Sequence, residues 1–320
     1  MTKRLKIILS STALVSTLAM ASWSTAQDAV PVSGDQFGYG NSALAGVSGR
    51  LTMFGGGDSD GAIYGGAPSL ALPVGQDFAV QFDGIGGVAA DEVGFAGVGA
   101  QFFYRNPSQM MAGITGGGLY VDGNWQYSVA AVAEYYMDNI TLEGLAGYQW
   151  GDVAEKGVYG RVGGSLYVNP NFRLGAGVEY SEEQRWGGDL QAEALLESVP
   201  GMALFASALV DEDGATGIGG VRFYLTPATT LLETSRTKQS SDGVTLIDLH
   251  RKGAARTNLF ELAGSAFGLR TISRAAGGHF GDGGNGGGGN GGGGNGGNGG
   301  GGNGGGGNGG GGGGGTGSNG

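Results

Sequence analysis

The chain has 320 residues, 75 of them glycine, no cysteine, and a formal net charge of −11 from 17 basic and 28 acidic side chains. The lack of cysteine excludes disulfides, thiol catalysis and thiolate metal sites. The acidic balance offers no basic surface to nucleic acid, so that class of partner is excluded as well.

The first 26 residues have the pattern of a secretory signal peptide. A basic start at Lys3, Arg4 and Lys6 is followed by an apolar run and by the small residues Ser24 to Ala26 at the cleavage positions. The apolar run is shorter than the roughly 20 residues of a spanning helix, which disfavours a membrane anchor. Cleavage removes three basic residues and no acidic one, which leaves an exported chain with a charge of about −14.

A short polar lead-in, residues 27–42, precedes a long region, residues 43–226, in which apolar and polar residues alternate. Between Val158 and Val168, for example, the even-numbered residues are apolar or glycine, whereas Arg161 is odd-numbered. After a tight turn at 169–171 the alternation resumes with Leu174 and Val178 on the apolar face. Successive side chains of a strand point to opposite faces, so this stretch is predicted to be a β-hairpin with one apolar face.

About twelve such segments follow one another, starting near positions 45, 61, 77, 94, 110, 125, 140, 156, 172, 189, 202 and 215. Each has about 11 to 13 residues, which suits strands tilted by about 45° in a hydrocarbon layer of roughly 25 to 30 Å. The charged residues of these segments fall on the face opposite the apolar one: Arg50, Asp83, Arg105, Glu134, Glu143, Arg161, Arg173, Glu179, Glu193, Glu197 and Arg222.

Two architectures fit this alternation: a soluble β-sandwich with apolar residues inside, and a membrane barrel with apolar residues outside. The connectors favour the barrel, because tight ones such as VNPN alternate with acidic ones such as GDVAEKG. In a barrel these two sets lie at opposite ends, the tight turns in the periplasm and the acidic set at the external rim. Aromatic residues near the segment ends indicate interfacial girdles. The fold expected is a closed antiparallel transmembrane β-barrel with both ends periplasmic.

The signal peptide, the twelve alternating segments and the stretch from Gly220 to Leu225 resemble the Gram-negative outer-membrane β-barrel (porin-like) superfamily. In that superfamily the last strand typically carries a glycine followed by alternating apolar or aromatic residues, here Phe223 and Leu225, which the barrel-assembly machinery reads. The resemblance covers residues 43–226 and implies contact with outer-membrane lipids and lipopolysaccharide. It departs from the superfamily in that the chain continues from Pro227 to Gly320.

The inner face has two interpretations. Its charges and glycines, among them Gly97, Gly99, Gly163 and Gly177, could line a narrow channel for passive passage of ions or small polar solutes. Structural ion pairs could instead fill the interior, because twelve strands lie between the filled eight-stranded barrels and the open sixteen-stranded ones. The second interpretation makes the protein a non-conducting structural or adhesive barrel with an acidic rim.

No catalytic, cofactor or metal site is predicted. Both histidines, His250 and His279, follow the barrel segments, so a Ser–His pair at the rim would require the tail to fold back. The acidic stretches 58–61 and 211–214 match no calcium loop and are typical of solvated rim loops.

Two segments follow the barrel. Residues 227–276 are predicted to form a periplasmic linker with room for a short helix over apolar residues such as Leu259 and Leu269, docked beneath the barrel or inside it. Residues 277–320 are almost entirely glycine and asparagine and cannot bury enough apolar surface to fold, so a disordered tail is expected. Such a tail is either a periplasmic spacer that contacts the cell wall or an inert extension.

Overall fold

The structure, a computed structural model, describes residues 42–276 except 59–60, 91, 183–184, 213, 227–243 and 261–268. The predicted signal peptide, most of the lead-in, the Gly/Asn-rich tail and His279 therefore lie outside the described residues. The described chain forms twelve strands: β1 (Ser48–Gly57), β2 (Ala62–Val74), β3 (Phe78–Ala89), β4 (Val93–Asn106), β5 (Met110–Val121), β6 (Asn124–Met137), β7 (Ile140–Gly151), β8 (Gly157–Asn169), β9 (Phe172–Ser181), β10 (Arg185–Leu195), β11 (Met202–Asp211) and β12 (Gly214–Leu225). Two helices follow, α3 (Leu246–Lys252) and α4 (Leu269–Ala276).

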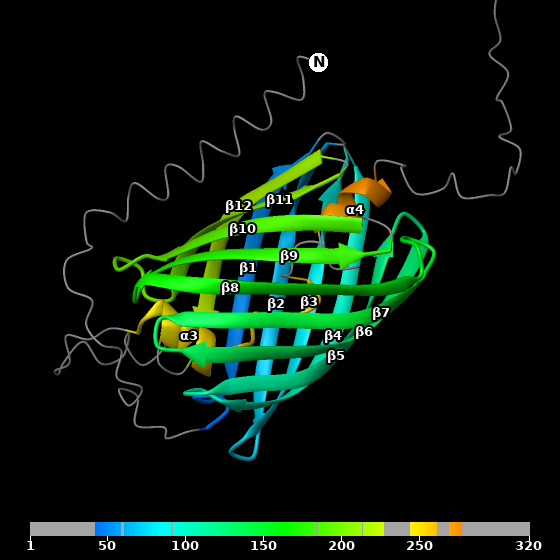
Figure 1. The fold of residues 1–320 in the computed structure, drawn as a ribbon. Helices are drawn as coiled ribbons and strands as arrows, with labels where there is room; N and C mark the ends of the chain where they lie inside the picture. The colour runs from blue at the N-terminus through cyan, green and yellow to red at the C-terminus, as the bar shows by residue number, and fades with distance from the viewer. Residues whose placement is uncertain are drawn as a thin grey trace, which may run out of the picture. The chain divides into compact units, whose positions relative to one another are not determined.

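The strands close into one antiparallel barrel in which each strand pairs with its neighbours in sequence and β1 pairs with β12 (Figure 1). The closing ladder aligns Leu51 with Phe223 and Arg50 with Tyr224. This confirms the prediction of a closed antiparallel barrel of twelve strands. Closure leaves no unpaired strand edge, which is the requirement for β-structure in lipid.

The two faces of the wall differ sharply. Large apolar side chains such as Val162, Val98 and Leu190 are 73%, 69% and 63% exposed on the outside, whereas arginines and glutamates on the alternate positions are buried. Exposed aromatic rings stack at both ends of the barrel: Phe78 lies 5.5 Å from Phe102, and at the other end Trp125 lies 6.0 Å from Tyr127. A lipid-facing apolar surface with aromatic girdles and a polar interior is the architecture of outer-membrane β-barrels.

The connectors are short at both ends of the barrel. We call the end that holds the connectors after β2, β4, β6, β8 and β10 the turn end, and the opposite end the loop end. One loop-end connector is the pair Asp122 and Gly123, with φ of +46° and +85°, which is the left-handed conformation required by a two-residue hairpin of type I′. Of the acidic stretches expected to be solvated rim loops, Asp60 and Asp213 lie outside the described residues, and Asp58 is buried and accepts from the Thr216 hydroxyl at 3.2 Å.

The chain after the barrel returns into it. Helix α3 lies at the turn end, where the Leu246 N–H donates to the carbonyl of Pro170 at 2.9 Å and the Ala45 N–H donates to the carbonyl of Lys252 at 3.0 Å. Residues 253–260 continue inside the barrel, and we call the whole stretch 244–260 the lumen segment. Helix α4 packs against β2, β3 and β5 (Figure 1). Of the two placements considered for this region, docking inside the barrel is the one observed for residues 253–260, whereas α3 lies at the turn end.

Candidate functional site

The lumen holds ten of the eleven charged residues that the alternation selects. Arg50, Asp83, Arg105, Glu134, Glu143, Arg161, Arg173, Glu179, Glu193 and Arg222 are all buried inside the wall. Glu197 does not join them, because β10 ends at Leu195 and Glu197 is exposed in the connector to β11. The alternation of apolar and polar residues continues in the sequence beyond the end of the strand. There the Leu196 N–H donates to the carbonyl of Met202 in the connector to β11.

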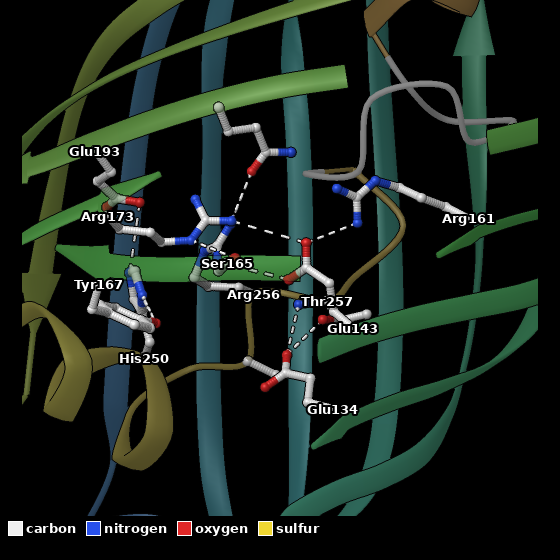
Figure 2. A network of polar contacts seen from close by, with 12 residues as sticks. Glu134, Glu143, Arg161, Ser165, Tyr167, Arg173, Glu193, His250, Arg256 and Thr257 are labelled. Atoms are coloured by element: carbon white, nitrogen blue, oxygen red, sulfur yellow. Dashed lines mark hydrogen bonds and ion pairs between the residues drawn. The ribbon is translucent and has the colours of Figure 1, made fainter. Parts of the chain in front are cut away.

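Glu143 on β7 is the centre of the charged network (Figure 2). Its Oε1 lies 2.8 Å from Nη1 of Arg161 on β8 and 3.9 Å from Nη2 of Arg173 on β9. Its Oε2 lies 3.8 Å from Nη1 of Arg256, which belongs to the lumen segment. Arg161 also binds both carboxylate oxygens of Asp189 at 2.8 and 2.9 Å, in the bidentate geometry that suits a guanidinium.

Two members of this network were missed by the sequence analysis. Asp189 lies on the same face of β10 as Glu193. It was not selected because the segment was expected to start at about position 189, whereas β10 begins at Arg185. Arg256 lies in a stretch with no period, and nothing in the sequence indicates that it enters the barrel. The alternation found the wall residues because they repeat every second position, and it cannot find a partner that comes from outside the wall.

Wall side chains hold the main chain of the lumen segment directly. Arg105 donates to the carbonyl of Gly253 at 2.6 Å, and Arg50 donates to the carbonyl of Ala255 at 3.2 Å. The amide of Gln81 both donates to the Ala255 carbonyl at 3.1 Å and accepts from the Ala255 N–H at 2.6 Å. These bonds satisfy backbone groups that would otherwise be buried without partners.

Polar side chains of the segment pair with acids of the wall. Thr257 donates from its hydroxyl to Glu134 at 2.6 Å and from its N–H to the same oxygen at 3.3 Å (Figure 2). Asn258 donates to Asp83 at 3.3 Å. Hydrogen bonds to charged groups are worth more than neutral ones, about 1.5 to 3 kcal/mol each. The segment therefore fits this wall through specific contacts along its length.

His250 of α3 is buried against the barrel wall, because the chain after β12 folds back, which the sequence analysis did not expect. Its Nδ1 is 2.7 Å from the hydroxyl of Tyr167 and its Nε2 is 2.8 Å from that of Tyr224 (Figure 2 shows Tyr167 and Glu193 beside it). Tyr224 donates to Glu193, so its oxygen accepts from Nε2–H and Nδ1 accepts from Tyr167. Both ring nitrogens thus bond tyrosine hydroxyls and no serine, an arrangement that fastens α3 to the wall.

Glycines on the inner face make room for side chains. A Cβ on Gly97 would lie 2.9 Å from the ring of Phe260, and one on Gly163 or Gly177 would lie 2.8 or 2.5 Å from the guanidinium of Arg161. A cavity of about 50 Å³ lies between Phe260 and the wall, which is room for a few water molecules. The space that the glycines leave in this part of the lumen is therefore filled by the network and by the segment.

The wall by itself carries an excess of acid. Its buried charges comprise seven carboxylates, Asp58, Asp83, Glu134, Glu143, Glu179, Asp189 and Glu193, and five arginines, Arg50, Arg105, Arg161, Arg173 and Arg222. Arg256 adds one positive charge beside the carboxylate with the most arginine partners. Within the described residues, no three acidic or histidine side chains are grouped so as to hold a metal ion, and no helix is long and apolar enough to span a membrane.

Comparisons with known proteins show a likeness of architecture. The KdgM porin in complex with disordered oligogalacturonate matches with a TM-score of 0.44 and 11% identity over 55% of this chain and 97% of its own. An outer-membrane channel from Pseudomonas putida F1 matches with 0.43 and 12% over 58% and 97%, and the outer-membrane phospholipase A from Escherichia coli with 0.41 and 11% over 55% and 92%. No family model and no curated protein matches the chain. The closed wall, its apolar outer face and its charged interior give this chain the architecture of a transmembrane β-barrel.

Proposed function

We propose that this protein is an outer-membrane barrel closed by its own lumen segment, with a structural and not an enzymatic role. It would reach the outer membrane of a Gram-negative cell by a cleaved signal peptide and be inserted by the barrel-assembly machinery. Its outer face would contact lipid and lipopolysaccharide, with the turn end in the periplasm. Strand parity supports this orientation, because β1 begins and β12 ends at the turn end.

One observation carries the proposal: the part of the lumen segment from 253 to 260 is bonded to wall residues from six strands. Its partners are Arg50 on β1, Gln81 and Asp83 on β3, Arg105 on β4, Glu134 on β6, Glu143 on β7 and Gln191 on β10. A segment held on so many sides crosses the interior and does not lie along one wall. Passive passage of solutes requires the segment to leave.

Planar-bilayer recordings test this closure. The full chain and a chain ending at Ala276 should give no steady current, whereas a chain ending at Thr226, which keeps β12 and lacks the segment, should give steady single-channel steps. In case the shortened chain folds poorly, the full-length double variant Arg256→Glu, Thr257→Glu places acids against Glu143 and Glu134 and should open the lumen. Equal steady conductance from the full chain and the opened forms would disprove closure.

The porin-like channel for ions or small polar solutes is the second candidate, and the charged wall favours it. Beneath the segment the wall presents side chains such as Arg173 and Glu193 that would line an open lumen. Spontaneous, reversible opening of the full chain in the same recordings would support this role, with the segment acting as a plug.

A further inference from the structure

We propose that the chain enters the lumen from the turn end with residues 244–260 and reaches the loop end with α4, so that the chain beyond Ala276 starts at the cell surface. The inference rests on the proposed function in that both require the segment to fill the lumen. It adds the direction in which the chain runs through the barrel. It also replaces the expectation that the Gly/Asn-rich tail is a periplasmic spacer in contact with the cell wall.

The contacts of the segment advance steadily along the barrel. Gly253 is held by Arg105, next to the last residue of β4 at the turn end. Ala255 is held by Gln81, and Asn258 by Asp83, one inward position farther along β3. Each step in sequence is thus a step away from the turn end.

The next contacts lie deeper. A Cβ on Gly99 would be 3.3 Å from the ring of Phe260, and one on Gly117 would be 3.2 Å from Leu259. Gly99 and Gly117 face each other in the ladder between β4 and β5, about half way along both strands. The segment has therefore passed into the middle of the barrel by Phe260, where residues 261–268 begin.

Helix α4 completes the crossing. Ile272 is buried in the apolar cluster that contains Ile63 and Ala89, which pair with each other where β2 begins and β3 ends. Val121, the last residue of β5, and Val153 of the connector after β7 belong to the same cluster. All four residues mark the loop end, so α4 lies at the end opposite α3, as Figure 1 shows.

The chemistry of the segment suits such a path. Gly253, Ala254 and Ala255 are small, and arginines of the wall donate hydrogen bonds to their carbonyls. Arg256 is paired with Glu143, so it brings no uncompensated charge into the interior. An apolar end at Ile272 then caps the polar interior against the loop-end cluster. The described residues on both sides of 261–268 thus contact the wall.

Cysteine labelling tests the direction, because the natural chain has no cysteine. Single variants Ser318→Cys in the tail, Asp152→Cys in the exposed loop-end connector and Ser108→Cys in the exposed turn-end connector are treated with a membrane-impermeant maleimide, on intact and on permeabilised cells. We expect Ser318→Cys to label in intact cells as Asp152→Cys does, and Ser108→Cys to label only after permeabilisation. The inference is overturned if Ser318→Cys, like Ser108→Cys, is labelled only after permeabilisation.

A fourth variant, Thr257→Cys, tests the path. Its side chain is 1% exposed, so it should resist labelling from both sides and react only after denaturation. Reaction in the folded protein would show that the tail does not pass through the lumen. The outcomes separate the two proposals: a silent barrel with a periplasmic tail keeps the closure and rejects the direction, and a conducting barrel with an external tail does the reverse.

Discussion

At the scale of single residues, burial separates ion pairs that look alike in sequence. Glu143 is buried among Arg161, Arg173 and Arg256, whereas Glu182 forms a 3.9 Å pair with Arg185 in which both side chains are more than a third exposed. Removing one partner from a buried pair leaves a charge without compensation, whereas water screens an exposed pair.

We therefore expect Glu143→Gln to lower the free energy of unfolding by about 3 to 5 kcal/mol, because it leaves arginines in the lumen short of a counter-charge. The matched variant Glu182→Gln should change it by less than about 1 kcal/mol. Urea unfolding of the refolded protein in lipid or detergent gives both values. Similar losses in the two variants would contradict the central role of Glu143.

The outer face gives a second residue-scale prediction. Val158 and Val162 lie on the same face of β8 and are 53% and 73% exposed, but Val158 is next to the strand end and Val162 is further in. An arginine facing lipid costs about 2 to 4 kcal/mol at mid-depth and about 0 to 1 near an interface.

Val162→Arg should therefore impair insertion into vesicles, and Val158→Arg should be tolerated. The fraction of protein that runs in the compact, unheated position on gels measures insertion for both. The assignment of this face to lipid fails if Val162→Arg inserts as well as Val158→Arg.

At the scale of elements, strands were predictable and the lumen segment was not. Alternation places a strand wherever one face meets lipid and the other meets polar groups, so the starts of β5, β7, β9 and β11 coincide with the predicted positions 110, 140, 172 and 202. β10 begins earlier than predicted, because Gly188 interrupts the apolar face between Trp186 and Leu190.

The lumen segment follows no such rule. Its residues are buried on all sides by side chains of different strands, so their pattern has no period. The pairing of Arg256 with Glu143 joins residues far apart in sequence, and either residue alone is typical of a solvated surface. Only the three-dimensional arrangement shows that glycines such as Gly97 receive Phe260 and are not the lining of an open pore.

Strand β12 closes the barrel, which gives the element-scale prediction. Val221, Arg222 and Phe223 pair with β1 on one side and β11 on the other. A chain ending at Gly219 loses these residues and leaves two strand edges open in lipid, which is not tolerated. It should not give the compact band on unheated gels, whereas a chain ending at Thr226 should. A compact band from the shorter chain would mean that closure does not need β12.

At the scale of the whole molecule, the charge of the wall determines what an opened barrel would conduct. The buried carboxylates of the wall outnumber its arginines by seven to five. A lumen lined by a net negative charge attracts cations and repels anions, and narrow low-dielectric walls strengthen the effect. Arg256 of the lumen segment neutralises part of this negative excess. The electric field of the wall carboxylates is therefore strongest when the segment is absent.

The chain ending at Thr226 should therefore be cation-selective. Under a gradient of potassium chloride its reversal potential should take the sign set by potassium, because chloride is repelled by the wall. Glu134→Gln in the same shortened chain is the matched variant, since Glu134 is buried and forms no ion pair shorter than 4 Å among the described residues, so its removal lowers the acidic excess without freeing an arginine. The reversal potential of this variant should move toward zero. Anion selectivity, or a shift away from zero in Glu134→Gln, would show that the arginines of the wall and not its carboxylates control the open lumen.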